Sequence, residues 1–394
     1  MVLNPAWRYV PLSESVIILD SLRKPINRKE RDARTANKEM DELFPYFGAT
    51  GQVGYIDDYL IDGEYVLLGE DGAPFLDAFA NKAYIITGKA WVNNHAHILR
   101  SKGDNRFLCY YLNHFDYHDY VSGTTRLKLT QEQMKRIPVP VLPIEEQRRI
   151  VARIEELFSQ LDDAEATLQK AKAQLAVYRQ AVLKKAFDFV ETSSYHPLRT
   201  VIIGTPQNGL YKPKSDYCDD GTPILRIDGF YNGYILRDYF YKRVNLSTEE
   251  VERYRLELGD LVVNRVNSMP YLGKCALVRG LIEPTVFESN MMRIKLDTNM
   301  VDGNWITYYL SSHVGKRELT KNAKQAVNQA SINQTDVGNA LIPIPSISDQ
   351  KRMVRMIESR MSVCDSIEHT VNVALQQAEA MRQSILKHVF DGEL

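Results

Sequence analysis

The sequence predicts a mixed α/β protein in which two globular domains alternate with two long coiled-coil helices. The first observation is an internal repeat, because residues from Gln147 onward match those from Gln350 onward at a constant offset of 203 positions. The second is that apolar residues recur at helical spacing in both copies. The third is that short β-rich runs, separated by Gly, Asn and Asp turns, precede each copy. A length of 394 residues is sufficient for two or three such units.

These patterns divide the chain into four segments. We expect a first globular domain over residues 1–143, a first long helix over 144–190, a second globular domain over 191–346 and a second long helix over 347–394. A Pro-rich stretch precedes each helix, where Pro favours an extended backbone. The match between the domains is weaker than the match between the helices. This contrast indicates one retained task for the helices and different targets for the domains.

Each long helix is expected to bury one apolar seam. Apolar residues recur at steps of three and four in both copies, with Arg360 as the one polar break. A helix gains little stability from propensity alone, so the seam needs a partner, and the other copy is the simplest one. Because the first helix leads away from the first domain, a second helix packed on it must run antiparallel, with the domains in an inverted, pseudo-two-fold arrangement. The expected seam residues are Ile150, Ile154, Leu157, Leu161, Leu168, Leu175, Val182, Met353, Ile357, Ile367, Val371 and Ile385.

Composition and charge limit the classes of function. Hydrophobic residues make up 44% and charged residues 25% of the chain, as is usual for globular proteins. No apolar run is long enough to span a bilayer, and the N-terminal stretch lacks the pattern of a signal peptide, so we expect a cytoplasmic protein without membrane contact. The net charge of −1 argues against a uniformly basic surface. If the chain binds DNA, its basic residues must gather locally, or a partner must supply phosphate contacts.

Motifs for catalysis or metal binding are not recognised. A base-flipping methyltransferase needs Asn/Asp-Pro-Pro-aromatic, and the run Asn4-Pro5-Ala6-Trp7 lacks the second Pro. A phosphate-binding loop needs Gly-Lys-Ser/Thr after a Gly-rich turn, and every Gly-Lys pair is followed by another residue type. The four cysteines are far apart, and His95 and His97 have no third ligand at a familiar spacing. We therefore expect no catalytic residue, no metal and no cofactor in this chain.

Clusters of basic, amide and aromatic side chains are the candidates for DNA contact. Arg, Lys, Asn and Gln contact phosphates and base edges when loops or helix ends carry them into a groove. The alternative of a structural role stays open, because such clusters also lie on ordinary surfaces and in turns. The candidates in the first domain are Arg23, Lys24, Arg28, Lys29, Tyr46, Gln52, Tyr55, Asn93, Asn94, His95 and Arg126. Those in the second domain are Tyr211, Lys212, Asn264, Arg265, Asn267, Ser268, Asn328 and Gln329.

Three stretches carry a family resemblance: IPVPVLPIEEQRRI at 137–150, LGDLVVNR at 258–265 and LKHVFDGEL at 386–394. With these motifs the chain resembles the specificity subunit of type I restriction–modification enzymes. The second proline block departs from the first at Ser346–Asp349, where two residues and the Glu-Glu pair are missing, which leaves the start of the second helix in doubt. The resemblance implies two target-recognition domains, each reading one half of an asymmetric, interrupted DNA site. It also implies helices that set the spacer and dock methyltransferase subunits.

The resemblance implies three kinds of partner. These are double-stranded DNA, two copies of a methyltransferase subunit and, through the complex, a motor-nuclease subunit. S-adenosylmethionine is expected in the methyltransferase subunits and not in this chain. Two alternatives stay open: a specificity chain whose partner fuses methyltransferase and nuclease, and a two-headed coiled-coil adaptor that binds proteins instead of DNA. The divergence of the domains beside retained helices favours DNA recognition over the adaptor.

Overall fold

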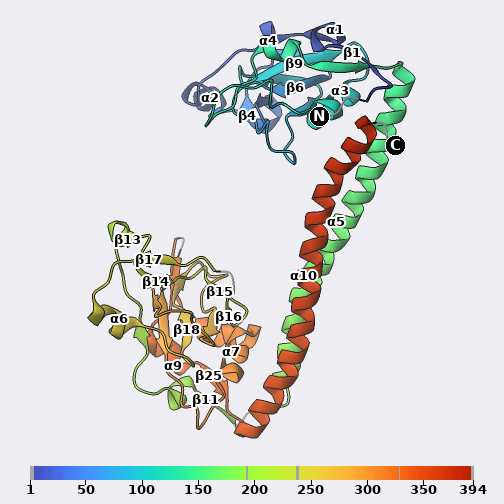
Figure 1. Ribbon diagram of the computed structural model, residues 1–394. Helices are drawn as coiled ribbons and strands as arrows, with labels where there is room; N and C mark the ends of the chain where they lie inside the picture. Colours follow the sequence, from blue (N-terminus) through green and yellow to red (C-terminus); the bar gives the residue numbers. More distant parts are fainter. Residues whose placement is uncertain (1–3, 192–193, 237–238, 328, 392–394) are drawn as a thin grey trace. The chain divides into compact units, whose positions relative to one another are not determined.

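The computed structural model describes residues 4–191, 194–236, 239–327 and 329–391 (Figure 1). The chain divides into two compact units. Unit 1 comprises Met1–Lys170 and Val371–Leu394, and unit 2 comprises Ala171–Thr370. Each unit holds one globular domain with parts of both long helices, and strands and helices are mixed in both, which confirms the predicted class. None of the described helices is long and apolar enough to cross a membrane.

The domain of unit 1 contains two four-stranded sheets and a two-stranded ribbon. The first sheet has the order β2-β9-β6-β7 and is antiparallel. The second has the order β4-β3-β8-β5, with β3 and β8 parallel. The ribbon pairs β1 with β10, and a ribbon with free edges tolerates prolines in β10. The strands are β1 (Arg8–Pro11), β2 (Val16–Ile18), β3 (Phe44–Gly48), β4 (Gly51–Ile56), β5 (Ile61–Asp62), β6 (Tyr65–Gly69), β7 (Ala83–Ile86), β8 (Lys89–Val92), β9 (Ala96–Ser101) and β10 (Pro138–Val141).

The helices of this domain have clear sequence causes. Asp104 caps α3 by accepting hydrogen bonds from the backbone N–H groups of Arg106 and Phe107, and α3 then packs on β6, β7 and β9. Thr130 and Gln133 form a capping box at the start of α4. The helices are α1 (Leu12–Ser15), α2 (Arg28–Thr35), α3 (Asn105–His114) and α4 (Gln131–Lys135).

The domain of unit 2 repeats the first sheet and the ribbon, whereas its second sheet keeps a parallel pair but has it at one edge. Its sheets have the orders β12-β22-β18-β20 and β13-β17-β14-β21, its ribbon pairs β11 with β25, and β14 and β21 are parallel. A hairpin β15-β16 and a sheet β19-β24-β23 are added. The strands are β11 (Tyr195–Pro197), β12 (Gln207–Asn208), β13 (Tyr217–Cys218), β14 (Thr222–Leu225), β15 (Phe230–Tyr231), β16 (Tyr234–Ile235), β17 (Lys242–Val244), β18 (Leu261–Asn264), β19 (Val266–Asn267), β20 (Cys275–Leu277), β21 (Val286–Phe287), β22 (Met291–Ile294), β23 (Lys324–Ala326), β24 (Gln329–Ser331) and β25 (Leu341–Pro343).

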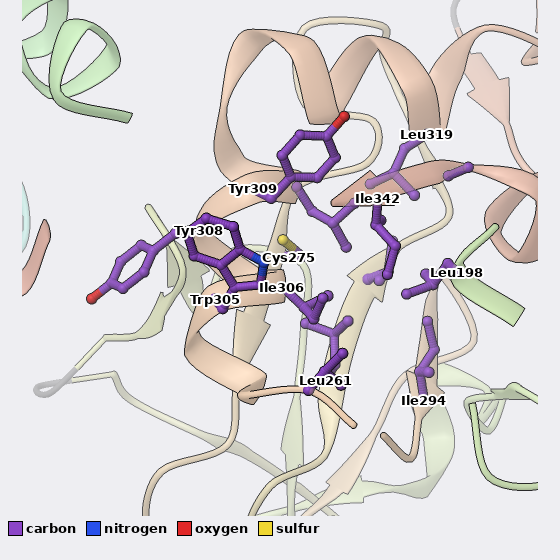
Figure 2. Close-up of a cluster of buried hydrophobic side chains, with 14 of the residues drawn as sticks. Leu198, Leu261, Cys275, Ile294, Trp305, Ile306, Tyr308, Tyr309, Leu319 and Ile342 are labelled. Atoms are coloured by element: carbon purple, nitrogen blue, oxygen red, sulfur yellow. The ribbon is translucent and has the colours of Figure 1, made fainter. Parts of the chain in front are cut away.

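The core of unit 2 is centred on α7 (Gly303–Ser311). Trp305, Tyr308 and Tyr309 of this helix are buried against strand residues such as Leu261 and Ile294 (Figure 2). The Trp305 indole N–H donates to the Pro343 carbonyl oxygen at 2.8 Å, so its polar atom is satisfied. The remaining helices of this domain are α6 (Thr248–Tyr254), α8 (His313–Thr320) and α9 (Gln334–Asn339).

The two long helices, α5 (Ile144–Phe187) and α10 (Ile347–Asp391), pack together (Figure 1). In unit 1, Ile154 of α5 shares a core with Phe390 of α10, while Glu165 lies beside Arg382. Higher numbers in α5 thus meet lower numbers in α10, so the helix segments run antiparallel. In unit 2 the same order holds, because Arg179 pairs with Glu368 while Phe187 shares a core with Ile357. α5 ends at Phe187, and the residues up to 190 form a turn.

In α10, one of the two inward positions of the seam lies one residue later than expected. Ile357, Cys364 and Val371 are buried at intervals of seven. The second inward position lies four residues after each of them and not three, because Met361 is 6% exposed whereas Ile367 is 44% exposed. Ile367 is therefore not a seam residue, and the apparent polar break at Arg360 lies beside the seam.

Ion pairs occupy the inward positions that are not apolar. Arg179 binds Asp365 at 2.7 Å and Glu368 at 2.9 Å in unit 2. In unit 1, Arg382 binds the repeat-equivalent carboxylates Asp162 and Glu165. A partly buried charge needs its partner, so these two clusters favour one helix register over others.

Candidate nucleic-acid interface

Helix α2 presents a basic surface on the domain of unit 1. Its inner side is held by cation–π contacts, since the Arg31 guanidinium lies 4.8 Å from the ring centre of Tyr46 and the Arg34 guanidinium 5.1 Å from that of Trp91. Arg34 also forms an ion pair with Asp57. Two candidates, Arg28 and Lys29, are exposed on this helix beside Glu30 and Asp32. Both side chains can contact phosphates, and Arg28 would exchange only a weak, exposed pair with Asp32.

A second group of candidates gathers around Asp71. Its carboxylate accepts from Arg126 Nε at 2.7 Å and lies 3.4 Å from His95 Nδ1. Asn94 precedes His95 in the same loop and is exposed. The structure thus brings Asn94, His95 and Arg126 together from two distant parts of the sequence, with amide and basic groups suited to base edges.

Arg23, also a candidate, lies inside a charge network. Its guanidinium contacts the carboxylates of Asp20 and Glu70 and donates to the Ala96 carbonyl oxygen at 3.1 Å. Its side chain is 16% exposed. With its donors used internally, Arg23 has a structural role in this conformation.

His97 completes this network. Its Nδ1 lies 2.7 Å from Asp20 Oδ2 and its Nε2 3.1 Å from the Leu129 carbonyl oxygen. His97 thus joins Asp20 to the backbone of Leu129. Burial raises the pKa of Asp20, but hydrogen bonds and the charge of His97 outweigh burial, so this pKa lies below its usual value. Asp20, Glu70 and His97 have the ligand types for a metal ion, but both ring nitrogens of His97 already bind protein acceptors and Arg23 lies against Glu70.

Arg23→Met is expected to lower the free energy of unfolding of unit 1 by about 3 kcal/mol, because it removes the nearest cation of the mostly buried Glu70 carboxylate and one of the two cations beside Asp20. Urea unfolding measures this change. Arg28→Met is the matched control: its side chain is 87% exposed, and its i,i+4 pair with Asp32 is worth about 0.5 kcal/mol at most. Equal, small effects of both substitutions would contradict the structural role of Arg23.

Three residues that the sequence suggested for DNA contact are buried, which corrects those predictions. Tyr46 is enclosed beneath α2, with its hydroxyl group bonded to the backbone of Ile26. Asn93 accepts a hydrogen bond from the His95 N–H group, and Asn264 donates to the Tyr271 carbonyl oxygen. All three side chains are buried, so they stabilise loops and do not reach a base edge. The candidates Lys24, Gln52 and Tyr55 are exposed.

In unit 2 the hairpin of β23 and β24 is an exposed polar element. It pairs with β19, which follows the candidates Asn264 and Arg265. Gln329 is exposed on β24, and Val327 is 99% exposed. Lys324 and Gln325 on β23 are also exposed and were missed as individual candidates. Asn328 lies outside the described residues.

The other candidates in unit 2 have mixed positions. Tyr211 is exposed, while Lys212 forms an ion pair with Glu250 at 2.9 Å. Arg265 donates to the Ser289 carbonyl oxygen at 3.0 Å. Asn267 ends β19, and its side chain accepts from the Ser268 N–H group. Of this set, Tyr211 is the most accessible.

Lys274 is a basic residue that the sequence did not single out. Its ammonium lies 3.8 Å from the ring centre of Tyr231 and 4.8 Å from that of Phe230. Burial is the main reason that its pKa falls to about 8. A lysine between two aromatic rings has no sequence signal, because the rings come from a separate hairpin.

The long helices carry a different surface, on which a groove in one unit corresponds to a groove in the other. In unit 2 a cavity of about 700 Å³ lies beside α5, α7 and α8, and its lining includes Arg179 and Gln180. In unit 1 a cavity of about 510 Å³ lies beside α10 and α3, and its lining includes Arg382 and Gln383. These two pairs of residues are 203 positions apart, so the grooves are equivalent under the repeat.

Comparison with known families identifies this architecture. The family description "Type I restriction modification DNA specificity domain" matches residues 22–173 and again residues 202–377. The chain belongs to this family. Both matches include one globular domain and part of a long helix, as the repeat predicted, and the suspected resemblance is confirmed.

Individual relatives agree with the family. The specificity subunit of the type I restriction enzyme EcoKI from Escherichia coli K12 is 28% identical over 271 residues, which are 66% of this chain and 58% of the relative. The StySPI specificity subunit from Salmonella potsdam is 28% identical over 269 residues, with the same coverage of 66% and 58%. The matches thus span less than two thirds of these relatives. A solved structure described as the basis of complex assembly and conformational transition of the type I R-M system has the same fold, with a TM-score of 0.69, 18% identity and full coverage of both chains.

Proposed function

We propose that this chain is the DNA-specificity subunit of a type I restriction–modification complex in the cytoplasm. Each domain reads one half of an asymmetric, interrupted site on double-stranded DNA, and the helix pair sets the spacer. The observation that carries the proposal is a shared topology with different exposed residues. The Asn94–His95–Arg126 group belongs to unit 1, whereas the β23–β24 hairpin with Gln329 belongs to unit 2. Two copies of one domain with different reading groups suit two different half-sites.

The chain is proposed to recognise DNA without catalysing a reaction. Methyl transfer would come from methyltransferase subunits that hold S-adenosylmethionine, and cleavage from a motor-nuclease subunit. We expect the purified chain to transfer no methyl group from radiolabelled S-adenosylmethionine to DNA, while the complex with its methyltransferase subunits does so. Turnover by the chain alone would contradict this proposal.

The two equivalent grooves support binding of two copies of one partner. Each groove combines a repeated Arg-Gln pair of a long helix with a helix of the adjacent domain. Equivalent surfaces bind equivalent partners, so two methyltransferase subunits are expected for each chain. Partner-supplied phosphate contacts would also account for the net charge of −1.

Asn94→Ala and Gln329→Ala are expected to relax recognition in different halves of the site. Loss of a base-edge hydrogen bond costs about 1–3 kcal/mol of discrimination, or roughly tenfold or more in preference for the correct base. Methylome sequencing of cells that carry each variant with its partner subunits measures this preference. Each variant should admit other bases in one half-site and keep the other half unchanged. An equal loss across both half-sites would point to phosphate contacts or misfolding.

A further inference from the structure

A glutamine in the first turns of α5 ties that helix to the domain of unit 1. The Gln147 Oε1 atom accepts from the backbone N–H group of Asp104 at 2.9 Å, and its Nε2 atom donates to the Leu142 carbonyl oxygen at 2.8 Å. Asp104 is the N-cap of α3. One side-chain amide thus joins the Pro-rich segment before α5, α5 itself and the start of the central domain helix.

The same arrangement recurs in unit 2, 203 positions later. The Gln350 Oε1 atom accepts from the backbone N–H group of Asp302, the N-cap of α7, at 2.9 Å. Its Nε2 atom donates to the carbonyl oxygens of Pro345 at 2.8 Å and Met300 at 3.2 Å. The bonds join the same atoms in both copies, although most of the domain sequence around them has diverged. A helix can be buried and capped without a glutamine that makes these bonds, so the need for a buried, capped helix does not explain why both copies have them.

Both domain helices also receive the far end of the other long helix. The ring centre of Phe390 in α10 lies 5.4 Å from that of Tyr111 in α3. In unit 2, the ring centre of Phe187 in α5 lies 4.5 Å from that of Trp305 in α7. The aromatic contacts, together with other apolar residues of the long helices, hold the side of each domain helix. The glutamine adds a polar contact at the N-terminal end of the domain helix.

We propose that Gln147 and Gln350 are positioning residues that set the angle at which each domain is held on the long helices. This inference rests on the function proposed above: the angle determines the distance between the two half-sites that the complex accepts. Neither glutamine is a DNA-reading residue. Their loss should therefore change the tolerated spacer length and leave the half-site sequences unaltered.

The test uses the complex of the full chain with its methyltransferase subunits and a DNA library in which only the spacer length varies. Gln147→Met and Gln350→Met keep a side chain of similar size and remove the hydrogen bonds. The wild type should prefer one spacer length, and each variant should raise relative methylation of spacers one base pair longer or shorter by about tenfold, the effect of losing one to two hydrogen bonds.

Thr167→Ala and Thr370→Ala are the matched controls. These threonines are also 203 positions apart, and their hydroxyl groups donate within their own helices, to the carbonyl oxygens of Asp163 at 2.9 Å and Ser366 at 3.0 Å. Because they do not join a helix to a domain, the controls should keep the wild-type spacer. A spacer shift in the controls as large as in the glutamine variants would overturn the specific role of the glutamines.

Gly103→Ala provides a variant that leaves Gln147 in place. A Cβ atom at Gly103 would lie 2.5 Å from the Gln147 Oε1 atom, so the amide must move away from Asp104. This variant should reproduce the relaxed spacer of Gln147→Met and speed hydrogen exchange of the Asp104 amide. If Gln147→Met does not fold, Gly103→Ala decides the question.

The outcomes separate the two proposals. A wild-type spacer in both Gln147→Met and Gly103→Ala, or unchanged exchange at the Asp104 amide in Gly103→Ala, would overturn the positioning role alone. A wild-type complex that methylates no interrupted site would overturn the proposed function and this inference together.

Discussion

Phe390→Ala in α10 is expected to lower the free energy of unfolding of unit 1 by about 3–5 kcal/mol, the usual cost of removing a buried aromatic side chain. The Phe390 ring is buried between Phe107 and Tyr111 of α3 and also contacts Trp7. The stability of the domain of unit 1 thus depends on a residue more than two hundred positions further along the chain. Urea unfolding followed by hydrogen exchange of α3 amides measures the change.

Phe187→Ala is the matched substitution in unit 2. Phe187 packs on Trp305 and Tyr309, so the loss should fall on α7 and spare α3. Phe189→Ala serves as the control, since this side chain is 44% exposed and should change stability by about 1 kcal/mol or less. A loss below 1 kcal/mol for Phe390→Ala would show that the end of α10 is dispensable for the core of unit 1.

Insertion of one heptad into both long helices is expected to lengthen the spacer by about three base pairs, because seven residues add about 10.5 Å at 1.5 Å each. The sites are after Ala173 in α5 and after Val373 in α10. Both lie between the ion-pair clusters of Arg179 and Arg382, so each cluster keeps its partners. Seven residues also return the seam to nearly the same face. Methylome sequencing reads the spacer directly.

Insertion into α5 alone is the control for this experiment. It shifts one half of the seam against the other and separates one Arg from its carboxylates, so methylation should fall at all spacers. A double insertion that methylates the original motif with its original spacer would contradict the role of the helices in setting half-site distance.

The helices could be predicted from the sequence, but their inward faces could not be fully assigned. Ile367 is apolar and yet exposed, while Glu368 faces its partner Arg179. An apolar pattern cannot reveal an inward carboxylate that is neutralised by an arginine far along the chain. Strand order was likewise beyond prediction, because the pairing of β3 with β8 joins segments that no local pattern relates.

The candidate DNA interface was predicted at the level of clusters more than of residues. Asn94, His95 and Arg126 were named from separate segments, and the structure brings them together at Asp71. Arg23 has the same residue type as Arg126 but is held by Asp20 and Glu70. The exposure of a side chain depends on partners that only the folded chain brings close. Residue type alone therefore could not distinguish a DNA-contacting residue from a structural one.

The packing of Phe390 on α3 also constrains the order in which the chain is made and folded. The ribosome adds about 280 residues between Tyr111 and Phe390, which takes roughly 15–55 s at 5–20 residues per second. Until then the apolar face of α3 that receives Phe390 has no cover from α10. Unit 2, whose residues are contiguous in sequence, can complete its core first. The domain translated first is therefore the one finished last, and the nascent chain needs protection from aggregation through that interval.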